Sequence, residues 1–193
     1  MKLRCLMVVT LLVGTAIAQQ PALTPGKERA DRIYDAYETQ LRQKLDAHFH
    51  AGEYEACVGI LKILVAQNPD DAQTVSDLVF MLGNVGREAE SLAEAIQFRR
   101  SHPEDAVAAQ VEANYYIKPT VKLYDRVPVV LEPIIEKSQF LQNFVSLARA
   151  YEEMGLLNEA IRIHELRIQR FPNDPTTATV RAKIEQLKAR IKA

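Results

Sequence analysis

The sequence contains little cysteine, little glycine and no excess of either charge. Only two of its 193 residues are cysteines, and the 7 glycines include no glycine-rich loop of the kind that holds phosphate groups. Basic residues number 24 and acidic residues 25, so no electrostatic attraction to nucleic acid or to an anionic membrane is expected. A Cys-x-x-Cys pair and a serine nucleophile motif are also absent. These absences argue against nucleic-acid binding and against several common enzyme classes.

The segment 1–18 has the pattern of a secretory signal peptide. Lys2 and Arg4 precede an apolar run from Cys5 to Ala18, which ends in the small-x-small pattern of a cleavage site. The run is shorter than the roughly 20 residues that a membrane-spanning helix needs. We therefore predict an exported protein, periplasmic or extracellular, with no stable membrane insertion after the signal peptide is cleaved. An uncleaved membrane anchor is the alternative.

Removal of residues 1–18 would take away Lys2, Arg4 and Cys5. The remaining chain would hold 22 basic and 25 acidic residues, with Cys57 as its one thiol. A lone cysteine makes no internal disulfide, so in an oxidising compartment the fold must depend on its hydrophobic core.

Glycine and proline recur at a fixed spacing along the rest of the chain. Three glycines are each followed by a proline, and the separation is identical in the three pairs: Gly52 and Pro69, Gly86 and Pro103, Gly155 and Pro172. The step from Gly52 to Gly86 matches the period of about 34 residues that is typical of a helix–turn–helix repeat. The second and third pairs are separated by two such periods plus one residue. This recurrence predicts a repeat array.

The spacing divides the chain into helical units. We predict a repeat domain over 27–174, preceded by a flexible leader over 19–26. Glycine turns and proline stops favour hairpins over approximately 38–71, 72–105 and 141–174. Asp71, Asp105 and Asp174 each stand two residues after a proline of the repeat, where they suit the N-cap of the next helix.

Residues 106–140 hold a unit that departs from the pattern. This stretch lacks the turn glycine and carries Pro119, Pro128 and Pro133. Either a kinked helix or an irregular insertion fits its second half. The last segment, 175–193, is amphipathic and is predicted to be a helix that caps the array.

The fourth unit resembles a tetratricopeptide repeat (TPR). The residues that carry the resemblance stand at the signature places of that family: Phe144, Leu147, Ala148, Tyr151, Gly155, Ala160 and Pro172. The pattern departs at His164, where an aromatic residue is usual, and at Arg167, where a small one is usual. The resemblance implies an all-α, right-handed α-solenoid of helical hairpins with a C-terminal capping helix.

The sequence contains no convincing catalytic or metal site. Cys57 occupies the small, helix-crossing place that Ser91 and Ala160 occupy in other hairpins, so we interpret it as a packing residue. His48 and His50 lie on different sides of a helix and are too few to bind zinc, which needs three or four ligands. Acidic pairs such as Asp70-Asp71 fit helix caps better than acid–base catalysis. We predict no enzymatic activity, no metal and no cofactor.

The resemblance implies that the first helix of each hairpin lines a concave groove that binds an extended peptide or a partner helix. Carried over by position, it nominates these groove residues: Arg42, Asp46, Phe49, Ser76, Phe80, Asn84, Gln142, Val145, Arg149 and Glu152. The divergent unit adds Gln110, Asn114 and Lys118. Some family members bind a C-terminal carboxylate through a lysine- and asparagine-rich clamp. Arg42, Asp46 and Ser76 occupy those places here, so that ligand is not predicted.

From these features we predict a scaffold or adaptor that binds a protein or peptide in the cell envelope or secreted space. Two alternatives remain open. One is a self-assembling structural protein that buries the groove, or the stripe of Tyr34, Tyr37 and Leu41, in a homo-oligomer. The other is an accessory subunit of an envelope enzyme that acts on cell-wall polymer.

Overall fold

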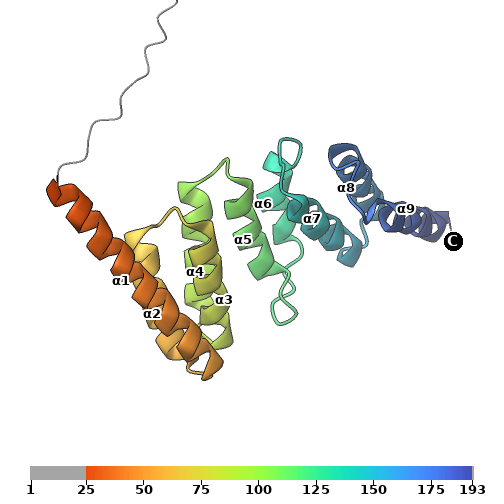
Figure 1. Ribbon diagram of the computed structural model, residues 1–193. Helices are drawn as coiled ribbons and strands as arrows, with labels where there is room; N and C mark the ends of the chain where they lie inside the picture. The colour runs from red at the N-terminus through yellow and green to blue at the C-terminus, as the bar shows by residue number, and fades with distance from the viewer. Residues whose placement is uncertain (1–24, 193) are drawn as a thin grey trace, which may run out of the picture. The chain divides into compact units, whose positions relative to one another are not determined.

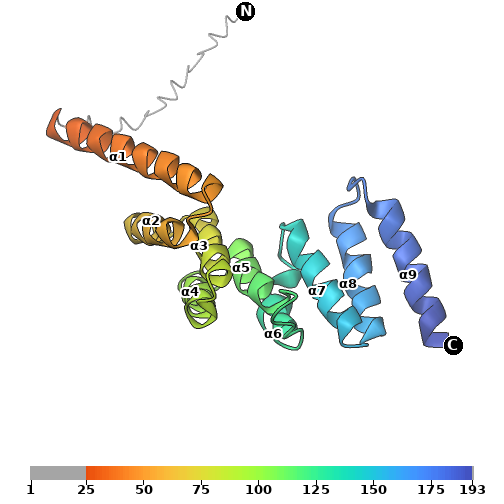
Figure 2. The ribbon, with the colours of Figure 1, turned by 90° about the horizontal axis from the view of Figure 1, so that it is seen from below.

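The computed structural model describes residues 25–192, and nine α-helices and no strand are found in that range (Figures 1 and 2). Their bounds are α1 Pro25–His50, α2 Tyr54–Gln67, α3 Ala72–Asn84, α4 Glu88–Ser101, α5 Ala106–Tyr116, α6 Arg126–Ile135, α7 Leu141–Glu153, α8 Leu157–Arg170 and α9 Thr177–Lys192. The predicted signal peptide (1–18) and most of the predicted leader lie outside the described residues. Helix α1 begins at Pro25, so the last two residues of the predicted leader, Pro25 and Gly26, are helical. Among residues 25–192, no helix is both long and apolar enough to span a membrane.

The described part of the chain divides into two units between Tyr37 and Glu38, within α1. In the first unit, residues 26–37 are helical and exposed, including the apolar residues Ile33, Tyr34 and Tyr37. The second unit runs from Glu38 onward and contains the last part of α1 with all the other helices.

In the second unit each helix packs against the next from α2 to α9. Helix α3 also contacts α5, and α5 contacts α7, so the first helices of successive hairpins form a layer of their own (Figure 2). In the last part of α1, Leu41 is buried, and Leu45 packs against a cluster of buried residues from α2 and α3 that includes Leu61 and Leu82. Helix α9 packs on α8. This arrangement confirms the predicted all-helical array of hairpins with a final helix beyond the last pair.

The periodic glycines make the turns inside three hairpins. Gly52, Gly86 and Gly155 have φ between 74° and 77°, the left-handed region that favours glycine. In each turn the N–H of the residue after the glycine donates to the carbonyl five residues before it, as Glu53 does to His48 at 2.9 Å. This bond terminates the first helix of the hairpin.

The two helices of a hairpin cross closely at one small residue. The Cys57 thiol donates to the carbonyl of Leu45 at 3.8 Å, and the Ser91 hydroxyl donates to the carbonyl of Val79 at 2.7 Å, in both cases twelve residues back. Ala160 is buried at the same place in the fourth hairpin. Burial raises the pKa of the Cys57 thiol, which keeps the sulfur protonated and unreactive. The packing role that the sequence predicted for Cys57 is confirmed.

The aspartates that follow each proline cap the next helix or the turn before it. Asp71 accepts from the N–H of Gln73 and Thr74, and Asp105 accepts from the N–H of Val107. Asp174 accepts from the N–H and hydroxyl of Thr176 and also from buried Arg167. These contacts explain why an arginine is tolerated where a small residue is usual.

The divergent unit combines a long turn with a short helix. Residues 117–125 connect α5 to α6 with Lys122 at φ 53°, and the Leu123 N–H donates to the carbonyl of Tyr116 at 2.9 Å. Helix α6 then continues through Pro133 and buries Val127, Leu131 and Ile135. The unit therefore keeps the second helix of a hairpin and replaces the glycine turn by a longer connection.

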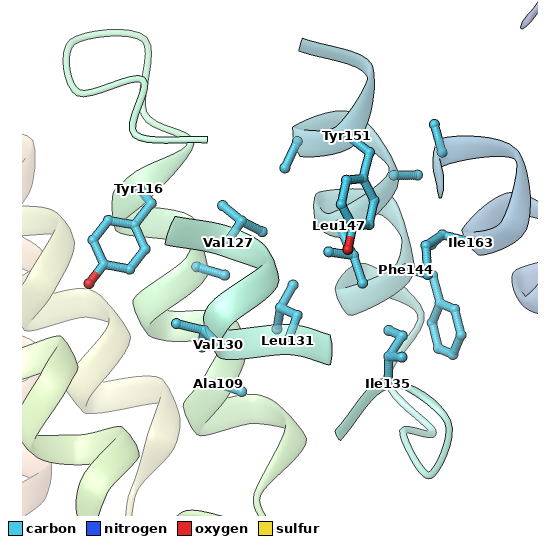
Figure 3. Close-up of a cluster of buried hydrophobic side chains, with 14 of the residues drawn as sticks. Ala109, Tyr116, Val127, Val130, Leu131, Ile135, Phe144, Leu147, Tyr151 and Ile163 are labelled. Carbon is cyan, nitrogen blue, oxygen red and sulfur yellow. The ribbon is translucent and has the colours of Figure 1, made fainter. Parts of the chain in front are cut away.

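The largest core cluster lies where α5 to α9 meet (Figure 3). Leu131 and Ile135 of α6 lie near Phe144 and Leu147 of α7 in this view, and all four are completely buried. Asn143, also buried, donates to the carbonyl of Ala106 and to the hydroxyl of Ser138. The core is continuous across the divergent unit, so that unit remains part of the array.

Candidate protein-binding groove

Two pockets lie along the layer formed by the first helices of the hairpins, and they share one residue, Phe80. The first pocket lies between the last part of α1, α2 and α3 and has a volume of about 320 Å³. Its lining is Arg42, Leu45, Asp46, Phe49, Leu61, Asp77, Phe80 and Met81. The second pocket spans α3, α5 and α7 and is of similar volume, about 320 Å³. We refer to the two together as the groove.

The floor of the first pocket is apolar and its rim is charged. Leu61 and Met81 are buried beneath it, whereas Phe49 and Phe80 keep 43% and 54% of their surface exposed. Phe49 also lies 6.0 Å from the Tyr54 ring, centroid to centroid. Large exposed aromatic side chains facing a concave surface are unusual in a protein without a partner there.

Arg42 is already paired with acidic residues of the same chain. Its guanidinium pairs with Glu38 at 2.8 Å and with Asp71 at 3.3 Å, and it reaches the hydroxyl of Thr74. Asp77 differs, because no cation of the described residues lies within 4 Å of it. Its carboxylate accepts a hydrogen bond from the side-chain amide of Gln73 at 2.8 Å. Burial raises the pKa of Asp77, as expected for a carboxylate without a charged partner.

The second pocket contains two cations and no acidic residue. Its polar lining comes from Ser76, Asn114, Lys118 and Arg149, and its apolar lining includes Tyr115. Lys118 Nζ lies 3.7 Å from Glu88 and 4.7 Å above the Tyr115 ring. Arg149 is exposed, and within residues 25–192 no carboxylate lies within 4 Å of it.

The structure brings six of the ten nominated groove residues into the two pockets. Arg42, Asp46 and Phe49 line the first, Ser76 and Arg149 line the second, and Phe80 lines both. From the divergent unit, Asn114 and Lys118 also line the second pocket. The other nominated residues, Asn84, Gln142, Val145 and Glu152, line neither pocket.

Two nominated side chains make contacts between helices. Gln110 is buried between α5 and α7, where its amide donates to Asn114 at 2.6 Å and to Ser146 at 2.8 Å. Glu152 pairs with His164 of α8 and Lys183 of α9. Both side chains therefore join helices to one another.

Sequence reasoning missed several residues that line the pockets. Asp77 was overlooked because the nominations followed a four-residue step through Ser76 and Phe80, although residues three apart also share a helix face. Ile117 and Pro119 lie in the long connection after α5, whose path the repeat pattern did not specify.

Among the described residues, no group of three histidine, cysteine or acidic side chains is arranged to hold a metal ion. His102 instead forms a hydrogen bond with Asp70, 32 residues away in the sequence, at 3.0 Å. The groove offers apolar surface and separate charges, an arrangement suited to binding.

Buried His164 and partly buried Glu152 form a pair that couples α7 to α8. His164 Nε2 lies 3.1 Å from Glu152, whose other oxygen pairs with Lys183 at 2.7 Å. Burial lowers the pKa of His164 despite the nearby carboxylate, with Arg167 and Lys183 acting in the same direction. Burial also acts to raise the pKa of Glu152, but Lys183 and His164 outweigh it and the pKa is lowered.

We expect this pair to make stability depend on pH. Because the pKa of folded His164 is lowered, the unfolded chain binds its proton first as pH falls below about 6.5. The stabilisation is therefore complete above that pH and declines as pH falls toward the folded pKa. Denaturant unfolding between pH 7.5 and 5 should show the parent chain losing stability relative to His164→Phe. A difference that stays constant over this range would contradict the assignment.

Comparison with solved structures shows that the fold belongs to the class of TPR-like helical repeats. The structure titled MamA 41-end from Desulfovibrio magneticus RS-1 is 16% identical and has a TM-score of 0.53, with 81% of this chain and 97% of that chain covered. The structure titled MamA RS-1 ArsTM double mutant is 16% identical with a TM-score of 0.54, covering 79% and 95% of the two chains. The structure titled MamA MSR-1 C2 is 20% identical with a TM-score of 0.54, covering 81% and 90%.

At such identities the likeness shows the fold alone, and it confirms the predicted solenoid of TPR-like hairpins. No protein-family model and no curated protein sequence matches the chain.

Proposed function

We propose that this protein is an exported scaffold that binds a protein or peptide along the groove formed by the last part of α1 with α3, α5 and α7. The observation that carries the proposal is the position of Phe80, which is 54% exposed and lines both pockets. A TPR-like array presents such a surface ready-made, so little ordering of the binding site is needed.

Phe80 has the properties of an anchor residue in an interface. It is aromatic, it lies where the two pockets meet, and the buried side chains of Leu61 and Met81 support the pocket floor beside it. Interface energy is usually concentrated in a few aromatic or arginine residues near the centre of the contact. Arg149, which is exposed in the second pocket, is a candidate arginine of this kind.

The extracytoplasmic location belongs to the proposal and rests on the amino-terminal pattern of residues 1–18. Fractionation of cells that express the full chain provides its test. The proposal expects a shortened chain in the extracytoplasmic fraction, and a full-length chain in the cytoplasm would contradict it.

Phe80→Ala is expected to weaken partner binding by about 30-fold, because truncation of an interface anchor costs about 2 kcal/mol or more. A crosslinking pull-down from extracytoplasmic extract would compare the parent chain with Phe80→Ala and with Phe140→Ala, and then measure the captured partner's affinity. Phe140 is also an exposed phenylalanine but lines neither pocket. Capture lost in Phe80→Ala and kept in Phe140→Ala would support the groove, and equal capture by all three chains would refute it.

Self-assembly is a second candidate, and one observation favours it. Ile33, Tyr34 and Tyr37 of the first unit are exposed apolar side chains within little more than one turn of helix α1. Light scattering of the full chain would separate the two candidates. An oligomer that dissociates on Tyr37→Ser substitution would favour self-assembly, and a monomer would favour the adaptor.

A further inference from the structure

The two pockets on either side of Phe80 carry opposite charge. The first pocket is lined by Arg42, Asp46 and Asp77, and the second by Lys118 and Arg149. The sum of formal charges is negative in the first and positive in the second. An occupant of the whole groove would therefore meet acidic groups at one end and basic groups at the other.

The acidity of the first pocket is available to a ligand because its arginine is already engaged. Arg42 pairs with Glu38 and Asp71, both of which lie outside the pocket lining. Asp77, in contrast, has no cation of the described residues within 4 Å, and the one such basic group near Asp46 is His50, at 3.4 Å. A bound basic side chain would supply the missing countercharge.

The basic groups of the second pocket are similarly available. Arg149 is exposed, and no carboxylate in the described part of the chain lies within 4 Å of it. Lys118 has a distant partner, Glu88 at 3.7 Å, and otherwise faces the Tyr115 ring and the Ser91 hydroxyl. An acidic side chain of a ligand would find a guanidinium and an ammonium in one pocket.

We propose that the groove recognises a polypeptide segment that carries a basic side chain, an apolar side chain and an acidic side chain in that spatial order. The basic group occupies the first pocket beside Asp46 and Asp77. The apolar group covers Phe80, and the acidic group enters the second pocket beside Arg149. This inference rests on the proposed function and adds to it the chemistry of the partner, because complementary charge fixes specificity and orientation more than it raises affinity.

The test uses the full chain and a set of labelled peptides with blocked ends, so that no terminal charge contributes. Each peptide has a central leucine, with lysine on one side and glutamate on the other, in both sequence orders and at several spacings. Peptides of the same length with two lysines, two glutamates or two glutamines are the comparison. We expect one mixed-charge order to bind about tenfold tighter than every comparison peptide in fluorescence anisotropy.

A charge exchange in the protein makes the test specific. The variant Asp77→Lys with Arg149→Glu exchanges the two pocket charges and should prefer the opposite peptide order. The control variant, Asp125→Lys with Arg126→Glu, exchanges two exposed charges outside the groove and should behave as the parent chain does. Both variants keep the net charge of the parent.

Three outcomes would overturn the inference: no preference for mixed charge, a preference unchanged by the groove exchange, or no binding of any peptide. The first outcome distinguishes failure of this inference from failure of the proposed function. If every peptide binds equally and binding is lost in Phe80→Ala, the groove binds polypeptide but does not select its charge. Partner capture that is insensitive to Phe80→Ala would instead refute the proposed function itself.

Discussion

Replacement of Phe144 by alanine is expected to lower the free energy of unfolding by about 3–5 kcal/mol. The Phe144 side chain is completely buried in the cluster where α5 to α9 meet. Its ring also packs edge-on against Phe171, with centroids 5.4 Å apart. The substitution removes this burial and leaves a cavity between helices whose backbones cannot close it. Urea unfolding followed by circular dichroism would measure the loss.

Phe140→Ala is the matched control for this prediction. Phe140 lies one helical turn earlier and is substantially exposed, so its truncation is expected to cost less than about 1 kcal/mol. Equal losses in the two variants would mean that Phe144 is not a core residue of the fourth hairpin.

Arg99→Ala is expected to lower the free energy of unfolding by about 3 kcal/mol, because it leaves a buried carboxylate without its cation. The carboxylate is Glu112 of α5, which is 3% exposed and pairs with Arg99 of α4. The hydroxyl of Tyr116 also donates to Glu112, at 2.9 Å, and would remain after the substitution. This ion pair joins the second hairpin to the divergent unit, so the loss should appear in unfolding of the whole array.

Arg100→Ala tests whether the effect belongs to the pair. Arg100 is the next residue, is exposed, and makes no ion pair within the described range. The free energy of unfolding of Arg100→Ala should lie within about 0.5 kcal/mol of that of the parent chain. If Arg99→Ala is equally mild, Glu112 is not an ionised buried group and the account of the α4–α5 junction is wrong.

These two contacts bear on function because the groove depends on the register of successive hairpins. The second pocket takes its lining from α3, α5 and α7, so its shape requires the junctions between hairpins to be fixed. Arg99 and Glu112 fix the junction of α4 with α5, and Phe144 fixes the junction of α7 with α8. A preformed groove costs less to bind than one that must be ordered by its partner.

Much of the fold could be predicted because local chemistry determines it. A residue with positive φ is required at each hairpin turn, so Gly86 and Gly155 mark the turns directly. An aspartate after each proline stop supplies the cap of the next helix or turn, as Asp71 does for α3. Such signals act within one helical turn and are visible in the sequence.

The candidate groove was predicted less completely because it depends on tertiary contacts. Glu152 is in the first helix of its hairpin, yet contacts with His164 and Lys183 hold it against α8 and α9. Gln110 is buried, and the hydroxyl of Ser146, 36 residues away, accepts a hydrogen bond from its amide. Nothing local to either residue reveals these partners. The connection after α5 carries no repeat signal, and so its contribution to the second pocket could not be foreseen.

The central claim, that a polypeptide binds in the groove, is tested most directly by a photo-crosslinking amino acid placed at position 80 of the full chain. The same group at position 129 is the control, since Val129 is 70% exposed on α6 and lines neither pocket. Irradiation in extracytoplasmic extract should give a discrete adduct with another polypeptide from position 80 and none from position 129. Adducts of equal yield at both positions, or an adduct from position 129 alone, would contradict the account.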